Sequence, residues 1–418
     1  MTATPYVKID REKSAQRIVR DVETLGGPEY TSSSEAICRY AYTPGYRNAL
    51  DYFERALREL DFEVFEDPVG NLVARNRPAG EKVFGIGSHC DSNRNGGKWD
   101  GTLGVVTALE VCRLNAEHGL DLPLQLISFM EEEASGFGVG LLGSRIAAGR
   151  VNEEELRGIR ALDDERPFVE HAREAGYEPE RWQESSRILT DLIGWIELHI
   201  EQARVLQDTG RTIGVVTAIA GLTWVEVIIE GRADHAGATP MDFRLDAGIP
   251  AAECVVELER IALEAGGGAV ATVGGFELTP GLTNVIPGQA RLRIDIRAPV
   301  DAIVDGIVKR LEETAKQAAE RRNMTATVTR LIGIPATPMD ERIVRVLEES
   351  AKQSGEPYML MASGAAHDTM CVADHAPTAM VFVPCKDGIS HSPEEDADPA
   401  DAAVGAELML NVIVELSG

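Results

Sequence analysis

The chain of 418 residues has few aromatic side chains, 5% of the total, and only six cysteines, none of them in a CxxC pair. It has no apolar run near the roughly 20 residues that span a bilayer. Residues 1–8 also lack the apolar core of a signal peptide. These absences give no indication of a membrane partner or of thiolate metal ligands. We expect a cytoplasmic protein whose cysteines are reduced.

Basic residues are scarce as well, with 41 Lys and Arg against 68 Asp and Glu, for a formal net charge of -27. This balance argues against nucleic acid or an anionic membrane surface as a partner, and it favours solubility. The chain is too long for one compact core of ordinary size, so two domains are expected. Apolar strand-like segments alternate with helical ones, which predicts an α/β fold.

A histidine follows the first strongly apolar segment. His89 comes after the strand-like run 83–86, at the carboxyl end where open α/β sheets place their sites. Asp91 is placed to accept the second ring N–H of His89, as partners of metal-binding histidines do. Asp100 lies in a Gly-rich loop before the helical segment 103–116 and could bridge two ions. The structural alternative is a core histidine and an aspartate that caps a helix.

Three adjacent carboxylates, Glu131, Glu132 and Glu133, follow the apolar run 124–130. Burying them together costs several kcal/mol unless cations or protons compensate. A metal centre would supply that compensation, with one carboxylate as a ligand and its neighbour free to move protons. A solvated helix N-terminus is the alternative.

Two further histidines occur in similar contexts. His199 lies in the alternating segment 195–202, and His391 lies in a loop after the apolar run 381–383. Imidazole and carboxylate ligands without thiolate suit Zn, Mn, Co or Ni.

In this order, the motifs resemble a bacterial group of dinuclear-metal amidohydrolases. That group contains N-carbamoyl-L-amino-acid hydrolase, allantoate amidohydrolase and β-ureidopropionase, within a clan that includes carboxypeptidase G-like and acylase-like enzymes. The similarity covers nearly the whole chain and rests on the segments 42–44, 67–72, 87–91, 131–135, 199–202, 234–237, 283–288 and 391–395.

The resemblance implies a role for each candidate residue. His89, Asp100 and His199 would hold one divalent ion, and Asp100, Glu133 and His391 the other, so that Asp100 bridges them. Glu132 would be the general base that takes a proton from water and passes it to the leaving nitrogen. The implied substrate contacts are Gln202, His235, Asn284, Arg297 and His367.

Two of these contacts have a chemical rationale. Arg297 suits a substrate carboxylate, because a guanidinium pairs with it through two hydrogen bonds. A pairing of Arg297 with Asp295 is the structural alternative. His235 could polarise the carbonyl and stabilise the oxyanion.

The pattern of strand-like and helical segments predicts an insert at residues 214–333, which opens with the strand-like segment 214–219. Residues 1–213 and 334–418 would then form the catalytic domain, and the resemblance implies that it has the fold of metal-dependent aminopeptidases with a mixed sheet. Residues 214–333 would form an inserted α+β lid. We expect this lid to make a homodimer and to carry His235 and Asn284 to the partner's site. Gly221 and the segment 332–334 would be its hinges, and closure would bring Arg297 to the substrate.

The chain departs from the family pattern at two positions. Gly136 stands where many relatives have Arg, and Ala203 stands where they have Gly. Neither change touches a predicted ligand or the base, so the reaction type is expected to survive, but the lost cation and the added methyl could fit the pocket to a different N-substituent. The expected reaction is hydrolysis of an N-carbamoyl-L-amino acid to amino acid, carbon dioxide and ammonia. Allantoate, β-ureidopropionate or another small N-acyl acid, cleaved as by an acylase or dipeptidase, are the alternatives. A non-catalytic binding protein would lack the base or a ligand, and none is missing.

Overall fold

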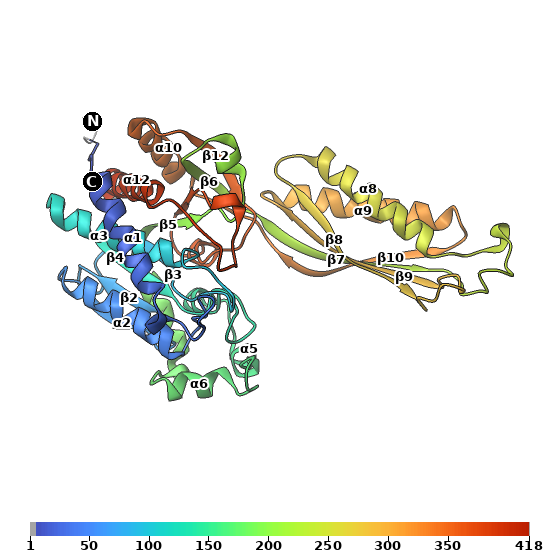
Figure 1. The fold of residues 1–418 in the computed structure, drawn as a ribbon, viewed down its shortest axis with the longest axis horizontal. Coiled ribbons are helices and arrows are strands. Elements are labelled where there is room, and N and C mark those ends of the chain that lie inside the picture. Colours follow the sequence, from blue (N-terminus) through green and yellow to red (C-terminus); the bar gives the residue numbers. More distant parts are fainter. Residues whose placement is uncertain (1–5, 418) are drawn as a thin grey trace. The chain divides into compact units, whose positions relative to one another are not determined.

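The computed structural model describes residues 6–417, and Figure 1 shows the course of the chain. The chain forms two compact units. The first contains the chain up to Thr217, the segment Met339–Met361 and the chain from Ala366 onward. The second contains Ala218–Pro338 and Ala362–Ala365. None of the helices within residues 6–417 has the length and apolar composition needed to cross a membrane.

The larger sheet has nine strands in the order β1-β2-β4-β3-β5-β13-β6-β11, with β12 also paired to β6. Neighbours among β4, β3, β5 and β13 run parallel, whereas β1, β2, β6 and β11 pair antiparallel, so the mixed-sheet prediction is confirmed. The strands span Glu63–Glu66 (β1), Leu72–Arg75 (β2), Val83–His89 (β3), Leu124–Phe129 (β4), Leu192–Ile200 (β5), Ile213–Ile219 (β6), Thr337–Pro338 (β11), Tyr358–Ser363 (β12) and Thr378–Val383 (β13).

Helices cover both faces of this sheet, which explains why β3, β4 and β13 are buried along their whole length. One face packs against α3 and α12, the other against α4, α11 and the 3-10 segment η2. The helices of this unit span Arg11–Leu25 (α1), Pro44–Arg58 (α2), Thr102–His118 (α3), Leu142–Ala147 (α4), Glu153–Gly158 (α5), Phe168–Glu174 (α6), Val205–Thr209 (α7), Glu341–Ser354 (α10), Thr369–Val372 (α11) and Pro399–Ser417 (α12), and η2 spans Pro179–Leu189.

The second unit is a four-stranded antiparallel sheet in the order β10-β7-β9-β8. Two helices pack on it and share a separate apolar core. The elements are β7 (Gly221–Glu230), α8 (Gly248–Ala265), β8 (Val270–Thr279), β9 (Gln289–Ala298), α9 (Asp301–Glu320) and β10 (Thr325–Ile334).

The structure differs from the expected lid at its first strand. The segment 214–219 was expected to open the insert, but as β6 it pairs with β13 and belongs to the larger sheet. Its side chains are buried almost throughout, as suits a strand of a covered sheet. The second unit therefore starts at Ala218, four residues beyond the expected boundary, and ends at Pro338, five residues beyond it.

Candidate metal centre

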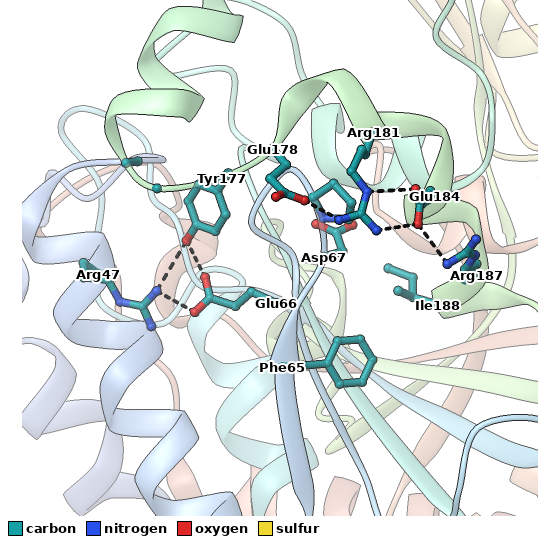
Figure 2. A pocket seen from close by; sticks show the side chains of 13 residues that line it. Arg47, Phe65, Glu66, Asp67, Tyr177, Glu178, Arg181, Glu184, Arg187 and Ile188 are labelled. Atoms are coloured by element: carbon teal, nitrogen blue, oxygen red, sulfur yellow. Dashed lines mark hydrogen bonds and ion pairs between the residues drawn. The ribbon is translucent and has the colours of Figure 1, made fainter.

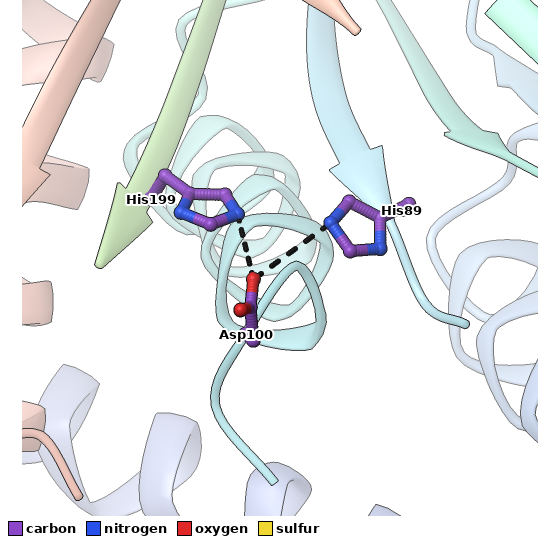
Figure 3. Close-up of side chains that lie close together, drawn as sticks. All are labelled: His89, Asp100 and His199. Atoms are coloured by element: carbon purple, nitrogen blue, oxygen red, sulfur yellow. Dashed lines mark ion pairs between the residues drawn. The ribbon is translucent and has the colours of Figure 1, made fainter. Parts of the chain in front are cut away.

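The carboxyl ends of the parallel strands bring three predicted ligands together (Figure 3). His89 is the last residue of β3, His199 lies near the end of β5, and Asp100 lies in the loop before α3. Asp100 Oδ1 is 3.0 Å from His199 Nε2 and 3.9 Å from His89 Nε2. All three residues are buried, and one ligand atom of each lies within 4.8 Å of the others.

Backbone carbonyls orient both of these histidine rings. His89 Nδ1 is 3.1 Å from the carbonyl oxygen of Asp91, and His199 Nδ1 is 2.9 Å from that of Ile200. A carbonyl only accepts hydrogen bonds, so each Nδ1 carries a proton, and Nε2, which faces Asp100, is the nitrogen left to bind a cation. This is the orientation that a metal-binding histidine requires.

A second group shares Asp100 and adds Glu133 and His391. His391 Nε2 lies 3.3 Å from Asp100 Oδ2 and 3.4 Å from Glu133 Oε2. The His391 side chain is 46% exposed, whereas those of Asp100 and Glu133 are 5% and 7% exposed. The two groups therefore meet at the two oxygens of one buried carboxylate.

The electrostatics of these carboxylates demand positive charge. Burial alone would raise the pKa of Asp100, but His199, His391 and His89 hold it well below its usual range. Burial raises the pKa of Glu133 to about 7, and Asp100 adds to that rise. Burial also raises the pKa of Glu132 well above its usual range, although His89 opposes the shift.

The donor set fits divalent metal ions. Two imidazoles and one carboxylate face each other in the first group, and one imidazole and two carboxylates in the second. Within the described residues, the buried atoms Glu133 Oε1 and Gln202 Oε1 have no hydrogen-bond partner. Acceptor oxygens left without donors in a buried cluster are suited to cations.

The side chains around Asp100 fix its position. Gln202 Nε2 donates to Asp100 Oδ2 over 2.8 Å, and Ser390 Oγ donates to the same oxygen over 2.9 Å. Glu395 Oε1 accepts the backbone N–H groups of Trp99 and Asp100 at 3.0 and 2.8 Å. Neither Ser390 nor Glu395 was among the site residues predicted from the sequence, although both lie close to His391 in the chain.

The carboxylates beside the ligands have separate tasks. Glu131 accepts the backbone N–H groups of Ala41, Gly136 and Phe137, so it shapes the loop and does not face a histidine. Asp91 Oδ2 accepts the N–H of Glu133 over 3.1 Å, while its Oδ1 lies 3.5 Å from His89 Nδ1. Asp91 thus contacts both ligand segments, although the shorter contact of His89 Nδ1 is to the Asp91 carbonyl.

Several residues at this site have strained backbone. Glu131, Ala134, Gln202 and His391 have φ between 53° and 59°, a region that residues with a Cβ rarely adopt. Such conformations persist where the surrounding structure requires them, and they cluster at functional sites.

His367 lies beside the first group. Its ring packs edge-on against that of His199, with centroids 4.6 Å apart, and both residues are buried. Glu197, His199 and His367 also meet the geometric condition for a metal group. However, Glu197 already accepts hydrogen bonds from Ser88 and Thr369, so we assign no ion to this third group.

The remaining predicted contacts belong to the second unit. His235 and Asn284 are neighbours there, since the N–H of Ala236 donates to the Asn284 carbonyl over 3.0 Å. His235 Nδ1 accepts the N–H groups of Gly237 and Ala238, which leaves Nε2 as the donor of a neutral ring. Arg297 pairs with Asp295 at 3.0 Å, the alternative noted from the sequence, and its side chain stays 35% exposed.

The structure also explains the glycine at position 136. A Cβ there would lie 3.0–3.1 Å from the Glu131 carboxylate oxygens and 3.1 Å from the Tyr40 ring. Arg94 lies over that Tyr40 ring and donates to the Ser135 carbonyl over 2.7 Å. A guanidinium therefore contacts this loop from the segment after β3, although position 136 has no side chain.

A surface pocket of about 560 Å³ lies elsewhere in the first unit (Figure 2). It is lined by three arginines, Arg47, Arg181 and Arg187, and none of the predicted site residues contributes to it. Each of these arginines already contacts a glutamate. With its charges paired, the pocket presents no free cation or anion to a ligand.

Comparison with known proteins identifies the family. The model of peptidase family M20/M25/M40 matches residues 85–415. This chain belongs to that family. It is 37% identical to an N-carbamoyl-L-amino acid amidohydrolase of Geobacillus stearothermophilus over 92% of this chain and 94% of that protein.

Two further relatives come from bacteria. An allantoate amidohydrolase of Bacillus subtilis (strain 168) is 30% identical over 93% of this chain and 95% of that protein. A solved amidase of the hydantoinase/carbamoylase family from Burkholderia multivorans matches with a TM-score of 0.85 and 31% identity, covering 99% of each chain. The resemblance inferred from the motifs is confirmed.

Gly101 provides a test of the first ligand group. Its φ is 58°, and a Cβ on it would lie 2.1–2.4 Å from the His89 ring. We expect Gly101→Ala to displace that ring, to weaken metal binding at least tenfold and to lower the free energy of unfolding by more than about 1 kcal/mol. Metal titration and denaturant unfolding would measure both effects.

Gly119 is the matched control, because its φ is 60° and nothing lies within 4 Å of its hypothetical Cβ. Gly119→Ala should show backbone strain alone, with metal binding unchanged. Equal metal affinities in the two variants would contradict the steric role of Gly101.

Proposed function

We propose that this protein is a metal-dependent amidohydrolase that cleaves a linear C–N bond of a ureido acid, with an N-carbamoyl-L-amino acid as its substrate. The observation that carries the proposal is the pair of ligand groups sharing Asp100, with Glu132 beside them. Relatives named for this activity and for allantoate hydrolysis match nearly the whole chain. Hydrolysis of allantoate is the second candidate.

Two divalent ions, Zn²⁺ or Mn²⁺ with Co²⁺ or Ni²⁺ as further options, would complete the site. His89, Asp100 and His199 would hold one, and Asp100, Glu133 and His391 the other. When bound, such ions act as Lewis acids and lower the pKa of water. Their charge would also offset the repulsion among the buried carboxylates.

Glu132 is suited to move protons at this site. Its side chain is 12% exposed, and its Oε2 lies 3.8 Å from His89 Nε2. Because its pKa is raised, it can take a proton from the attacking water and hold it until the leaving nitrogen requires one. Attack on the ureido carbonyl followed by this transfer gives the amino acid, and the released carbamate yields carbon dioxide and ammonia.

The other predicted residues would bind and orient the substrate. Gln202 and His367 lie beside the ligand groups in the first unit. The outward N–H of His235 would donate to the oxyanion, with Asn284 beside it, and Arg297 would pair with the substrate carboxylate. Closure of the second unit over the site, with Gly221 and 332–334 as hinges, would exclude water.

Ammonia release tests the proposal. We expect the Mn²⁺- or Zn²⁺-loaded protein to release ammonia from N-carbamoyl-L-amino acids in a panel that includes allantoate, β-ureidopropionate, N-acyl amino acids and dipeptides. Glu132→Gln should lower kcat by at least about 10²-fold with metal content unchanged. Glu133→Gln is the matched comparison and should lose metal.

Cleavage of N-acyl amino acids or dipeptides alone, detected through the free amine, would contradict the assignment of a ureido acid as the substrate. If Glu132→Gln instead loses metal, the roles of Glu132 and Glu133 are exchanged.

Arg297 is testable by separating KM from kcat. We expect Arg297→Ala to raise KM about tenfold or more while metal content stays intact, because one bidentate charge pair is worth roughly 1.5–3 kcal/mol. Asp295→Asn is the control, since Arg297 pairs with Asp295. An unchanged KM in Arg297→Ala, or the same rise in both variants, would reduce Arg297 to a partner of Asp295.

We further propose a homodimer formed through the second unit. Strand β8 is an edge strand with exposed Val270, Phe276 and Leu278. Helix α8 exposes Ile249, Val256 and Leu263, which lie seven residues apart on one face. An edge strand beside an apolar helix stripe suits a second copy of the same surface. The partner's site would then receive His235 and Asn284.

Sedimentation velocity tests the dimer. Val256 is 71% exposed, so Val256→Glu should leave the fold intact but produce monomers with much reduced turnover. Leu162→Glu, at a position 56% exposed in the first unit, is the control and should remain dimeric. A monomeric wild-type protein with full activity would rule the proposal out.

We also propose a cytoplasmic location. All six cysteines are free, which is in keeping with a reducing compartment.

A further inference from the structure

The three ligand histidines differ in what holds their second ring nitrogen. For His89 and His199 the partner is a backbone carbonyl, which no side-chain substitution can remove. For His391 the partner is a side chain: Asn93 Nδ2 lies 3.3 Å from His391 Nδ1. The ring of His391 is also 46% exposed, against 2% for each of the other two.

The loop that carries Asn93 is anchored on both sides. Before it, Ser92 exchanges hydrogen bonds with the backbone of Arg39, at 2.6 and 2.9 Å. After it, Arg94 donates to the Ser135 carbonyl over 2.7 Å and contacts Asp163 over 2.6 Å. Ser135 is two residues beyond Glu133, so the loop after β3 contacts both segments that carry the second ligand group. Asn93 is thus held in place against His391.

We propose that Asn93 is a positioning residue that selects the tautomer of His391 and thereby sets the affinity of the second ion. The inference rests on the proposed function only through its metal site. For Nε2 to bind a cation, Nδ1 must carry the proton and needs an acceptor. The amide of Asn93 supplies that acceptor when its Oδ1 faces Nδ1, a half-turn of the amide from the orientation seen here. Its Nδ2 instead favours the tautomer with the proton on Nε2, beside Asp100 and Glu133.

The two ion sites should consequently differ in strength. The first is built from buried side chains whose rings are oriented by the backbone. The second depends on a half-exposed ring oriented by an amide that serves either tautomer. We expect one tightly bound and one weaker ion, with Asn93 acting on the weaker one only.

Competition of Zn²⁺ between the protein and a chromophoric chelator gives the two dissociation constants. His391→Ala should abolish the weaker site and so identify it. Asn93→Leu replaces the amide with an apolar group of similar shape. It should raise the dissociation constant of the weaker site about tenfold or more and leave that of the tighter site unchanged. The carboxylate in Asn93→Asp only accepts hydrogen bonds, so this variant should bind the ion of the weaker site at least as tightly as the wild type does.

Asn95 is the matched control, being an exposed asparagine in the same loop. Asn95→Leu should bind both ions as the wild type does. Should the Asn93→Leu variant fail to fold, Asn93→Ala makes the same comparison. The proposal is overturned if Asn93→Leu, or Asn93→Ala in its place, leaves the dissociation constant of the weaker site unchanged, if the constants of both sites rise together, or if the wild-type protein binds a single ion.

These constants are measured without substrate, so they separate this inference from the proposed reaction. Suppose that the protein binds two ions and that Asn93→Leu weakens binding of the weaker one, but that no ammonia is released. The role of Asn93 would then stand, and the assignment as an amidohydrolase would be wrong.

Discussion

Buried negative charge at one edge of the larger sheet is the constraint on which the rest of the site depends. Glu131 and Glu395 accept hydrogen bonds from backbone N–H groups, and Glu197 accepts them from hydroxyl and backbone donors. Within residues 6–417, the ion pairs of Asp100, Glu132 and Glu133 are all with histidines. A neutral imidazole that presents a lone pair repels a carboxylate, so this arrangement is stable only with protons or metal ions between the groups. This edge of the sheet therefore needs positive charge, from protons or from metal ions.

The fold meets this requirement by topology. Neighbouring parallel strands end at the same edge, so His89, Glu133, His199 and His391, which are far apart in sequence, arrive there together. Their strands are buried on both faces, and the helices on each face prevent the edge from shifting. The sheet thus fixes the positions of the predicted ligands, while the loops after β3 and β13 supply the side chains that contact them. The second unit, which contains His235 and Arg297, has its own sheet and its own apolar core.

The sequence indicated residues that the structure brings together at this edge, because most of them lie at or just after the end of a recognisable apolar strand and because the motifs occur in the family order. That these residues bind metal stays a prediction. The sequence did not reveal the residues that act on those predicted ligands through long-range contacts. Glu395 contacts Asp100 across 295 residues, and Asn93 contacts His391 across 298, so no local periodicity signals either pair. Strand β6 was assigned to the wrong sheet for a related reason. An apolar strand shows that it will be buried, but not which neighbour it will pair with.

Gly136 shows how the chemistry and the surroundings of the site can vary separately. The space that a side chain would need there is taken by Tyr40 and by Glu131, whose carboxylate is held by three backbone N–H groups. The positively charged side chain beside this loop is Arg94, which belongs to another loop, donates to the Ser135 carbonyl and lies over the Tyr40 ring. Asp163 accepts hydrogen bonds from both Tyr40 and Arg94, so part of this charge is already compensated. The Glu131 carboxylate of this loop is thus held by backbone donors, and the positive charge beside the loop comes from Arg94 and is partly compensated by Asp163. Because this change touches neither the two ligand groups nor Glu132, under the proposed function it would act on the choice of substrate and not on proton transfer.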